Sequence, residues 1–364
     1  AADRRTAAAD QAQNGTAATL INSSLYLHIT SGSRYDAAGF DFFLCGLRMI
    51  KRLRANREAL RYIRDSSWML AEYGLKVISA IFVSSYVARF LGPAQFGILS
   101  YALAIAAIFI VISRLGMESI LVRDLARFPD DRQAYMSTAF GLMSAAALLA
   151  FLVLAGLVFW LETDPSTQLY IWIISASILF QTFLVVDYSF QAQVKAKYAS
   201  IAKSIALIFS AINKLVLVWL NADLVYFALF YALDHLVTGL VLLAVHGYTR
   251  QPAFFKGFQA RLVKPLLSSA WPMVLSAVAA TIYMRVDQIM IKNMLGAHEL
   301  GLYAAAAKIY EGWIIFPFVI SISLLPAIVR LKQGAVEQYE KNMARLFSLL
   351  FWSSAAVALT ATLA

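Results

Sequence analysis

Charged residues are scarce in this chain of 364 residues, where Asp, Glu, Lys and Arg together make up 14% of the sequence. An ordinary soluble domain carries about 25%. Hydrophobic residues reach 61%, and the mean hydropathy is +0.68. This composition excludes a typical soluble enzyme or binding domain and predicts a membrane protein built from long apolar segments.

Cysteine and nucleotide-binding motifs are also missing or nearly so. The single cysteine, Cys45, excludes an internal disulfide and a metal cluster built from cysteines. The phosphate-binding loop Gly-x-x-x-x-Gly-Lys-Ser/Thr does not occur, which argues against ATP hydrolysis by this chain. We expect no cofactor and no bound metal, and also no catalytic residues, because the connections between the apolar segments are too short to hold an active site.

Apolar segments fill most of the chain after residue 67. A helix needs about 20 residues to cross a bilayer, and nine segments are about that long. Gly, Ala and Ser are frequent inside them, which suits close packing of helices in lipid. The segments predict an all-α polytopic membrane protein with about nine transmembrane helices. They cover approximately residues 68–90, 98–116, 136–161, 168–188, 199–220, 224–246, 267–291, 302–328 and 343–363.

Basic residues occupy alternate connections between these segments. The connections over 91–97, 162–167, 221–223 and 292–301 contain only one, Lys292. Because Lys and Arg favour the cytoplasmic side, the pattern predicts a cytoplasmic N-terminus, and it explains the net charge of +10 without a nucleic-acid partner. The basic set begins with seven residues before the first segment and a loop over 117–135. It comprises Arg48, Lys51, Arg52, Arg54, Arg57, Arg61, Arg64, Arg123, Arg127, Arg132, Lys195, Lys197, Arg250, Lys256, Arg261, Lys264, Arg330, Lys332 and Lys341.

A short motif occurs twice. Residues 91–97 read LGPAQFG and residues 295–301 read LGAHELG, so both have the form Leu-Gly-x-x-x-x-Gly between two apolar segments. Glycines at these positions suit tight turns. A membrane protein that repeats a helix–turn–helix unit in this way is typically built from two related halves, a plan common among transporters.

The repeat predicts a domain organisation. Six apolar segments separate the two motifs, and an even number gives both halves the same orientation. We expect a first six-helix lobe over 68–246, a cytoplasmic linker over 247–266 and a partial second lobe of three helices over 267–364. About three further helices of the second lobe are then expected to be missing. Residues 1–67 form a cytoplasmic extension, and because the first methionine is Met49, residues 1–48 are expected to be either non-native or a disordered tail.

Three runs of sequence resemble a known family. ARFLGPAQFG at 88–97 resembles the first-loop signature of polysaccharide transporters, and YMRVDQIMI at 283–291 and GLYAAA at 301–306 resemble their seventh and eighth helices. From Arg64 to Ala364 the chain is similar to the O-antigen and exopolysaccharide (Wzx-like) flippases. These belong to the superfamily of multidrug/oligosaccharidyl-lipid/polysaccharide (MOP) exporters.

This resemblance implies two helical lobes arranged as an inverted V that opens alternately to each side of the bacterial cytoplasmic membrane. The implied substrate is an oligosaccharide linked to undecaprenyl pyrophosphate, for O-antigen, exopolysaccharide or capsule biosynthesis. The implied partners are this lipid-linked oligosaccharide, membrane lipid and other proteins of glycan assembly.

Charged residues inside the apolar segments are the candidate site. Each costs about 2.5–3.5 kcal/mol at mid-bilayer on insertion scales, so each needs a reason to be there. Arginine and lysine suit a lipid-linked diphosphate, because both donate charge-assisted hydrogen bonds to phosphate oxygens. The residues that we expect to bind substrate or couple transport are Arg285, Asp287, Lys214, Lys308, Glu311, Arg89 and Asp234.

Structural explanations compete with these roles. Lys308 and Glu311 are three residues apart and could simply neutralise each other on one helix face. Arg89 could extend to the outer headgroups. Asp287 could position Arg285 or respond to a coupling cation, although two residues apart on a helix they point in different directions. Similarly, Glu72 and Lys76 suit a solvated pair, and Asp187 is close enough to the cytoplasmic boundary to be hydrated.

Three other functional interpretations remain open. A drug/cation antiporter of the same superfamily would favour buried carboxylates over cations, and both occur here. A glycan polymerase or ligase would need a catalytic pocket, but the outer loops are too short to build one. A chain that lacks part of one lobe would be inactive. The acids and bases on the outer loops are Glu162, Asp164, Asp223, His298 and Glu299.

Overall fold

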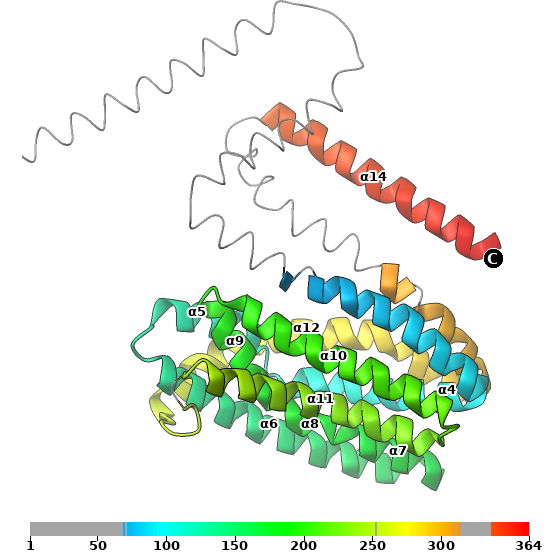
Figure 1. The fold of residues 1–364 in the computed structure, drawn as a ribbon, viewed down its shortest axis with the longest axis horizontal. Coiled ribbons are helices and arrows are strands. Elements are labelled where there is room, and N and C mark those ends of the chain that lie inside the picture. Colours follow the sequence, from blue (N-terminus) through cyan, green and yellow to red (C-terminus); the bar gives the residue numbers. More distant parts are fainter. Residues whose placement is uncertain (1–67, 70, 252, 309, 314–335, 364) are drawn as a thin grey trace, which may run out of the picture. The chain divides into compact units, whose positions relative to one another are not determined.

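A computed structural model describes residues 68–69, 71–251, 253–308, 310–313 and 336–363 of the chain. Every regular element in these ranges is a helix (Figure 1). The expected N-terminal extension and residues 314–335 lie outside the described residues. The predictions for residues 1–48 and for most of the eighth apolar segment therefore stay predictions.

The described helices follow one another with short connections. A helix over 71–78 continues through the π-helical turn η1 (Ser79–Val83) into α4. Another helix covers 297–308, between α12 and α14. The remaining elements are α4 (Ser84–Ser113), α5 (Met117–Arg127), α6 (Arg132–Leu161), α7 (Pro165–Ser175), α8 (Ser177–Phe180), the 3-10 turn η2 (Gln181–Phe183), α9 (Leu184–Ala192), α10 (Ala196–Trp219), α11 (Leu224–Tyr248), α12 (Ala260–Leu295) and α14 (Val336–Leu363).

Six helical stretches in the described residues are long and apolar enough to cross a membrane, and a shorter apolar helix covers Met343–Leu359. The first stretch, Ala71–Arg127, contains two of the expected segments, because α4 consists of two helical parts that meet at a kink at Gly92. The all-α polytopic class predicted from the sequence is confirmed.

The structure differs from three expectations about local structure. The connection expected over 117–135 contains the helix α5, whose Met117, Leu121 and Leu125 are buried while the Arg123 side chain is 60% exposed. Its apolar residues recur every four positions, so an amphipathic helix packs on the core there. The helix expected over 168–188 is broken into α7, α8, η2 and α9, and the linker expected to reach 266 ends where α12 begins at Ala260.

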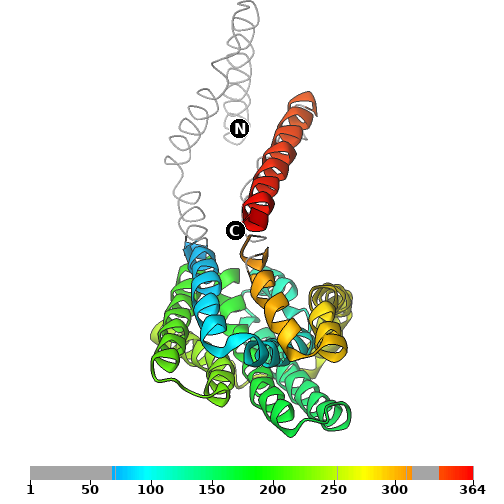
Figure 2. The same cartoon turned by 90° about the vertical axis from the view of Figure 1, so that its right-hand side faces the viewer.

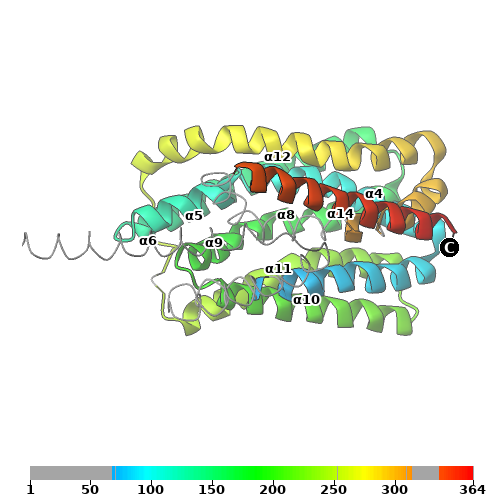
Figure 3. The same cartoon turned by 90° about the horizontal axis from the view of Figure 1, so that it is seen from above.

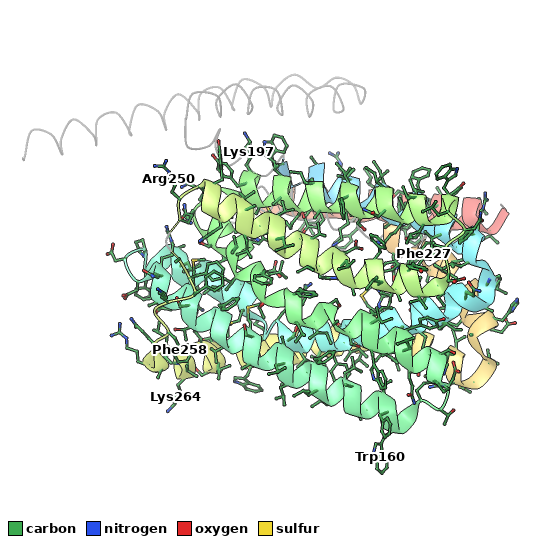
Figure 4. The ribbon with its side chains drawn as sticks, turned by 60° about the horizontal axis from the view of Figure 1, so that its bottom comes forward. Trp160, Lys197, Phe227, Arg250, Phe258 and Lys264 are labelled. Carbon is green, nitrogen blue, oxygen red and sulfur yellow. The ribbon has the colours of Figure 1, made fainter. Side chains whose placement is uncertain are left out.

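The basic residues collect at one end of the helices, as the alternation in the sequence predicted. Figure 4 shows Lys197, Arg250 and Lys264 at the same end and Trp160 at the other. In Figure 3, α12 and α10 run along opposite edges, with α4 and α11 between them. α12 packs against α4, α5 and α6, whereas α10 packs against α11 and α9.

Two apolar clusters form the core. One cluster contains Leu99, Leu154, Ile171 and Phe227, and it includes Leu300 from the second Leu-Gly motif. The other contains Met117, Met143, Tyr188 and Phe254. Helices from the predicted first lobe and from α12 or 297–308 contribute to both, so each cluster joins the two predicted halves among the described residues.

Both Leu-Gly motifs adopt the same turn. Gly92 has φ 72° and ψ 169°, and Gly296 has φ 100° and ψ 174°. This region is available essentially only to glycine, and in each motif a helix begins directly after it. Pro93 suits the first position of that helix because it lacks an N–H and its φ is already helical. The shared backbone conformation supports the internal repeat read from the sequence.

Candidate functional site

A pocket of about 430 Å³ lies between α4 and the helix over 297–308. α4 follows η1, and the other helix follows the second Leu-Gly turn; Figure 2 shows the start of α4 in blue and the residues around 300 in orange. Small residues leave the space open, and Arg89 and Lys308 bring positive charge to it. The residues that line it are Ser84, Ser85, Ala88, Arg89, Gly92, Pro93, Phe96, Gly301, Leu302, Ala305, Ala306 and Lys308.

Lys308 belongs to an ion-pair cluster. Its Nζ lies 2.8 Å from Glu311 Oε2, and Arg285 Nη1 lies 2.7 Å from Glu311 Oε1. One carboxylate is thus shared by two cations from two helices, α12 and the helix that follows it. Lys308 and Glu311 do form the ion pair that their spacing allows, and Arg285 joins it. Side-chain exposures of 24–26% leave the three groups partly accessible.

Asp287 does not hold Arg285, so that option from the sequence was wrong. Tyr303 donates its hydroxyl to Asp287 Oδ2, and the Asp287 Oδ1 atom accepts from the backbone N–H of Gln288 at 2.7 Å. Residues two apart on a helix point about 200° apart, which explains why Arg285 and Asp287 find different partners. The two charged side chains that line the pocket, Arg89 and Lys308, are both cations, and Glu311 reaches the site through its ion pair with Lys308.

Lys214 and Asp234 form a second pair, away from the pocket-lining residues. Lys214 Nζ lies 2.6 Å from Asp234 Oδ2 and donates to Ser210 Oγ at 2.8 Å. The sequence named Lys214 among the residues expected to bind substrate or couple transport, and in the structure α11 supplies its counter-ion. The structure therefore brings Arg89, Lys308, Arg285 and Glu311 to one site and places Lys214 with Asp234 elsewhere.

Sequence reasoning missed a third cluster. Lys203 on α10 pairs with Asp187 Oδ2 and Glu72 Oε1, each at 3.1 Å. Asp187 is 5% exposed and so is buried rather than hydrated, and Glu72 pairs with Lys203 instead of Lys76. Lys203 is the fifth residue of the apolar segment over 199–220, and a charge at that position was the available signal. The partners are distant in sequence, so only the fold identifies them.

Two further polar contacts join distant elements. Arg114 donates from Nε to Gln181 Oε1 at 3.0 Å, within the break between α7 and α9. At the opposite end from the basic residues, Lys292 Nζ lies 2.6 Å from Glu162 Oε2. Within the described ranges, no three His, Cys, Asp or Glu side chains come together as a metal site requires.

Six apolar helical stretches in the described residues, each long enough to cross a bilayer, define a multi-pass membrane protein with a partly charged pocket between its repeated units. The comparison with known families is specific. Residues 63–332 match the family described as Polysaccharide biosynthesis protein, and the chain belongs to that family.

A Shigella flexneri protein named "Putative O-antigen transporter" is 24% identical over 309 residues, which cover 79% of this chain and 71% of that protein. Its name and the family description fit a transporter in polysaccharide biosynthesis rather than an enzyme. The resemblance that the sequence motifs indicated is confirmed.

Proposed function

We propose that this protein moves an oligosaccharide linked to undecaprenyl pyrophosphate across the bacterial cytoplasmic membrane by alternating access, with the basic end in the cytoplasm. The observation that carries this proposal is the pocket that holds Arg89 and Lys308 between the repeated units. A diphosphate brings negative charge and acceptor oxygens that match an excess of cations. The lipid tail remains in the bilayer, and the sugar occupies the polar path.

Glu311 gives this site a way to bind and release. While it holds Lys308 and Arg285, both cations are partly neutralised. A diphosphate that enters the pocket competes with Glu311 for Lys308, so binding is favourable without being irreversible. A transporter needs this balance because a substrate bound too tightly is not released on the other side.

The buried carboxylates of the predicted first lobe do not favour the drug/cation antiporter. Such a site needs free buried carboxylates for a cationic drug. Asp187 and Glu72 are both held by Lys203, and Asp234 is held by Lys214. The two cations that line the pocket therefore fit an anionic glycan carrier better than a cationic drug.

Complementation of a flippase-deficient bacterium tests the proposal. The complete gene is compared with Arg89→Gln and Lys308→Gln, and surface glycan and the cytoplasmic lipid-linked intermediate are both measured. We expect the unchanged gene to restore surface glycan, and both variants to express but accumulate the intermediate. Arg89→Lys is the matched control and retains part of the activity because it keeps the charge.

Two results would contradict it. Normal surface glycan in the Arg89→Gln/Lys308→Gln double variant would exclude the pocket as the diphosphate site. Failure of the unchanged gene with several lipid-linked glycans, together with cation-dependent drug efflux, would establish the antiporter instead. The same assay tests the expected cooperation with other glycan-assembly proteins if it is repeated in strains that lack them one at a time.

A further inference from the structure

The two Leu-Gly turns contact each other reciprocally. A Cβ built on Gly97 would lie 1.8 Å from the carbonyl oxygen of Ala297, and a Cβ built on Gly301 would lie 1.8 Å from that of Pro93. Gly97 and Gly301 are the last residues of their motifs, and Pro93 and Ala297 are the third. Equivalent positions therefore exchange the same contact, as in a two-fold symmetric interface.

Gly97 and Gly301 allow the backbones of the two turns to approach each other closely. The sequence suggested tight turns for all four motif glycines, but positive φ occurs only at Gly92 and Gly296 of the four. At Gly97 and Gly301 the missing side chain lets one backbone touch another. Phe96 and Leu300, the residues just before them, are 3% and 0% exposed and pack in the same apolar cluster. The junction leaves no room for a methyl group.

An ion pair reinforces this junction at the same end of the helices. Glu162, just after α6, pairs with Lys292 in the last turn of α12 at 2.6 Å. The Lys292 ammonium also lies 4.5 Å from the centroid of the Tyr101 ring on α4. Both charged side chains are at least four-fifths buried. The ion pair and the contact with the Tyr101 ring both link the first predicted lobe to α12.

The junction forms one wall of the pocket. Pro93, Phe96 and Gly301 belong to the junction and also line the pocket. At 1.5 Å per residue, the helices carry Ser84 and Lys308 about 10–12 Å deeper than the turns. The pocket therefore lies between the turns and the basic end, and the turns close its far side.

We propose that the reciprocal glycine contact and the Glu162–Lys292 pair form a gate that closes the outer side of the pathway and must open to release the glycan. This inference rests on the proposed function, because the proposed function places the basic end in the cytoplasm and therefore the two turns on the outer side. Opening this junction separates the backbone contacts, the ion pair and the packed Phe96 and Leu300 side chains, and the junction re-forms in one geometry because the glycine contacts are reciprocal. Its two-fold character means that both turns move apart together.

Cysteine labelling tests closure without a glycan. Cys45→Ser removes the native thiol, Ala305→Cys reports on the pocket, and a membrane-impermeant maleimide is added from outside. We expect slow labelling in this background and about tenfold faster labelling when Gly97→Ala or Gly301→Ala is added, because the methyl group holds the turns apart. The matched control is Gly156→Ala, where no atom lies within 4 Å of the new Cβ and labelling should not change.

Cross-linking tests opening. In the Cys45→Ser protein, Glu162→Cys and Lys292→Cys are joined by a short reducible bis-methanethiosulfonate reagent. We expect transport to stop on cross-linking and to return on reduction. Continued transport by the cross-linked protein would show a permanent joint and overturn the gate. If this cysteine pair is inactive before cross-linking, the labelling comparison decides: equal rates in the Gly97, Gly301 and Gly156 variants overturn the gate.

These readouts separate the two proposals. Faster labelling in the glycine variants, without translocation of any lipid-linked glycan by the unchanged protein, supports the gate and removes the proposed substrate. Normal glycan export with unchanged labelling supports the substrate and removes the gate.

Discussion

Lys214 on α10 and Asp234 on α11 form an ion pair of 2.6 Å within two membrane-crossing helices. The Lys214 ammonium also donates to Ser210 and lies 3.8 Å from the centroid of the Tyr231 ring. Its hydrogen-bonding capacity is thus largely used within the protein. The pair fixes α10 against α11 rather than contributing a free cation to the pocket.

Removal of one partner from this pair should be costly. Lys214→Ala or Asp234→Ala leaves an uncompensated charge in a region where water is scarce, and we expect each to lower the free energy of unfolding by about 3 kcal/mol. The double variant Lys214→Met/Asp234→Leu should cost clearly less than the sum, because it removes both charges. Reversible unfolding in mixed micelles measures this. A double variant that is as unstable as the sum of the two single variants would contradict a direct pair.

Lys308 should contribute to affinity for the diphosphate group. Loss of a hydrogen bond to a charged group costs about 1.5–3 kcal/mol, so Lys308→Gln should weaken binding of a polyprenyl diphosphate roughly ten- to a hundredfold. Arg261→Gln, at the exposed start of α12, is the matched control and should bind normally. Titration of the purified protein with the lipid in nanodiscs gives both affinities. An equal affinity of both variants would exclude Lys308 as a ligand.

Glu311→Gln should have the opposite effect on binding. It frees Lys308 and Arg285 from the shared carboxylate while it keeps the shape of the side chain. We expect tighter diphosphate binding, by roughly tenfold, together with slower export because release is impaired. The same titration and the complementation assay measure the two quantities. Weaker binding in Glu311→Gln would show that Glu311 mainly positions the two cations.

The N-cap of α7 gives a pH-dependent prediction outside the membrane-crossing segments. Asp164 accepts from the Thr167 hydroxyl at 2.6 Å and from the Thr167 backbone N–H at 2.9 Å. These hydrogen bonds lower the pKa of Asp164 below its usual value near 3.8. The bond from the Thr167 hydroxyl has the largest effect, followed by the bond from the backbone N–H. A lowered pKa in the folded state gives stability that is present above the unfolded pKa and is lost as the pH falls through the folded pKa.

Asp164→Asn separates the cap from the charge. Asparagine caps a helix about as well as aspartate but does not titrate, whereas Asp164→Ala should cost about 1 kcal/mol at neutral pH. We expect the free energy of unfolding of the natural protein, relative to that of Asp164→Asn, to decrease as the pH falls below 4. Unfolding measured from pH 7 to 3 checks this, and a pH-independent difference would contradict the charge contribution.

Phe254 anchors the connection between α11 and α12. It is 1% exposed, and its ring lies 5.2 Å from His246 and 5.3 Å from Phe140 between ring centroids. Phe254→Ala should destabilise the protein by about 3–4 kcal/mol because it leaves a cavity. Phe258→Ala, on the same connection but 57% exposed, should cost less than half as much. Similar melting temperatures for both variants would contradict this anchoring role.

The length of the apolar segments and the charge of the loops explain which local features could be predicted from the sequence. Long apolar segments and the alternation of basic loops predicted the helices and the basic end, since a bilayer imposes both. The same criterion missed α5, because a short amphipathic helix with Arg123 on its polar face resembles a charged loop. It also missed the break after Ser175, because buried polar groups such as Gln181 find partners only in the folded protein.

Ion pairs between different helices explain which contacts at the site could not be predicted from the sequence. Lys308 and Glu311 were predictable because three residues bring them to one helix face. The addition of Arg285, and the pairing of Lys203 with Asp187 and Glu72, depend on which helices pack together. No spacing along the chain encodes those contacts.

The sequence by itself determined that this chain is an all-helical membrane protein, which family it resembles and that a Leu-Gly turn occurs twice. Apolar length, loop charge and glycine-specific backbone conformations are local properties. Only the tertiary structure decided that Gly97 and Gly301 meet the opposite turn, and that Arg89 and Lys308 share a pocket. Those relations depend on the packing of helices that lie about two hundred residues apart in the chain.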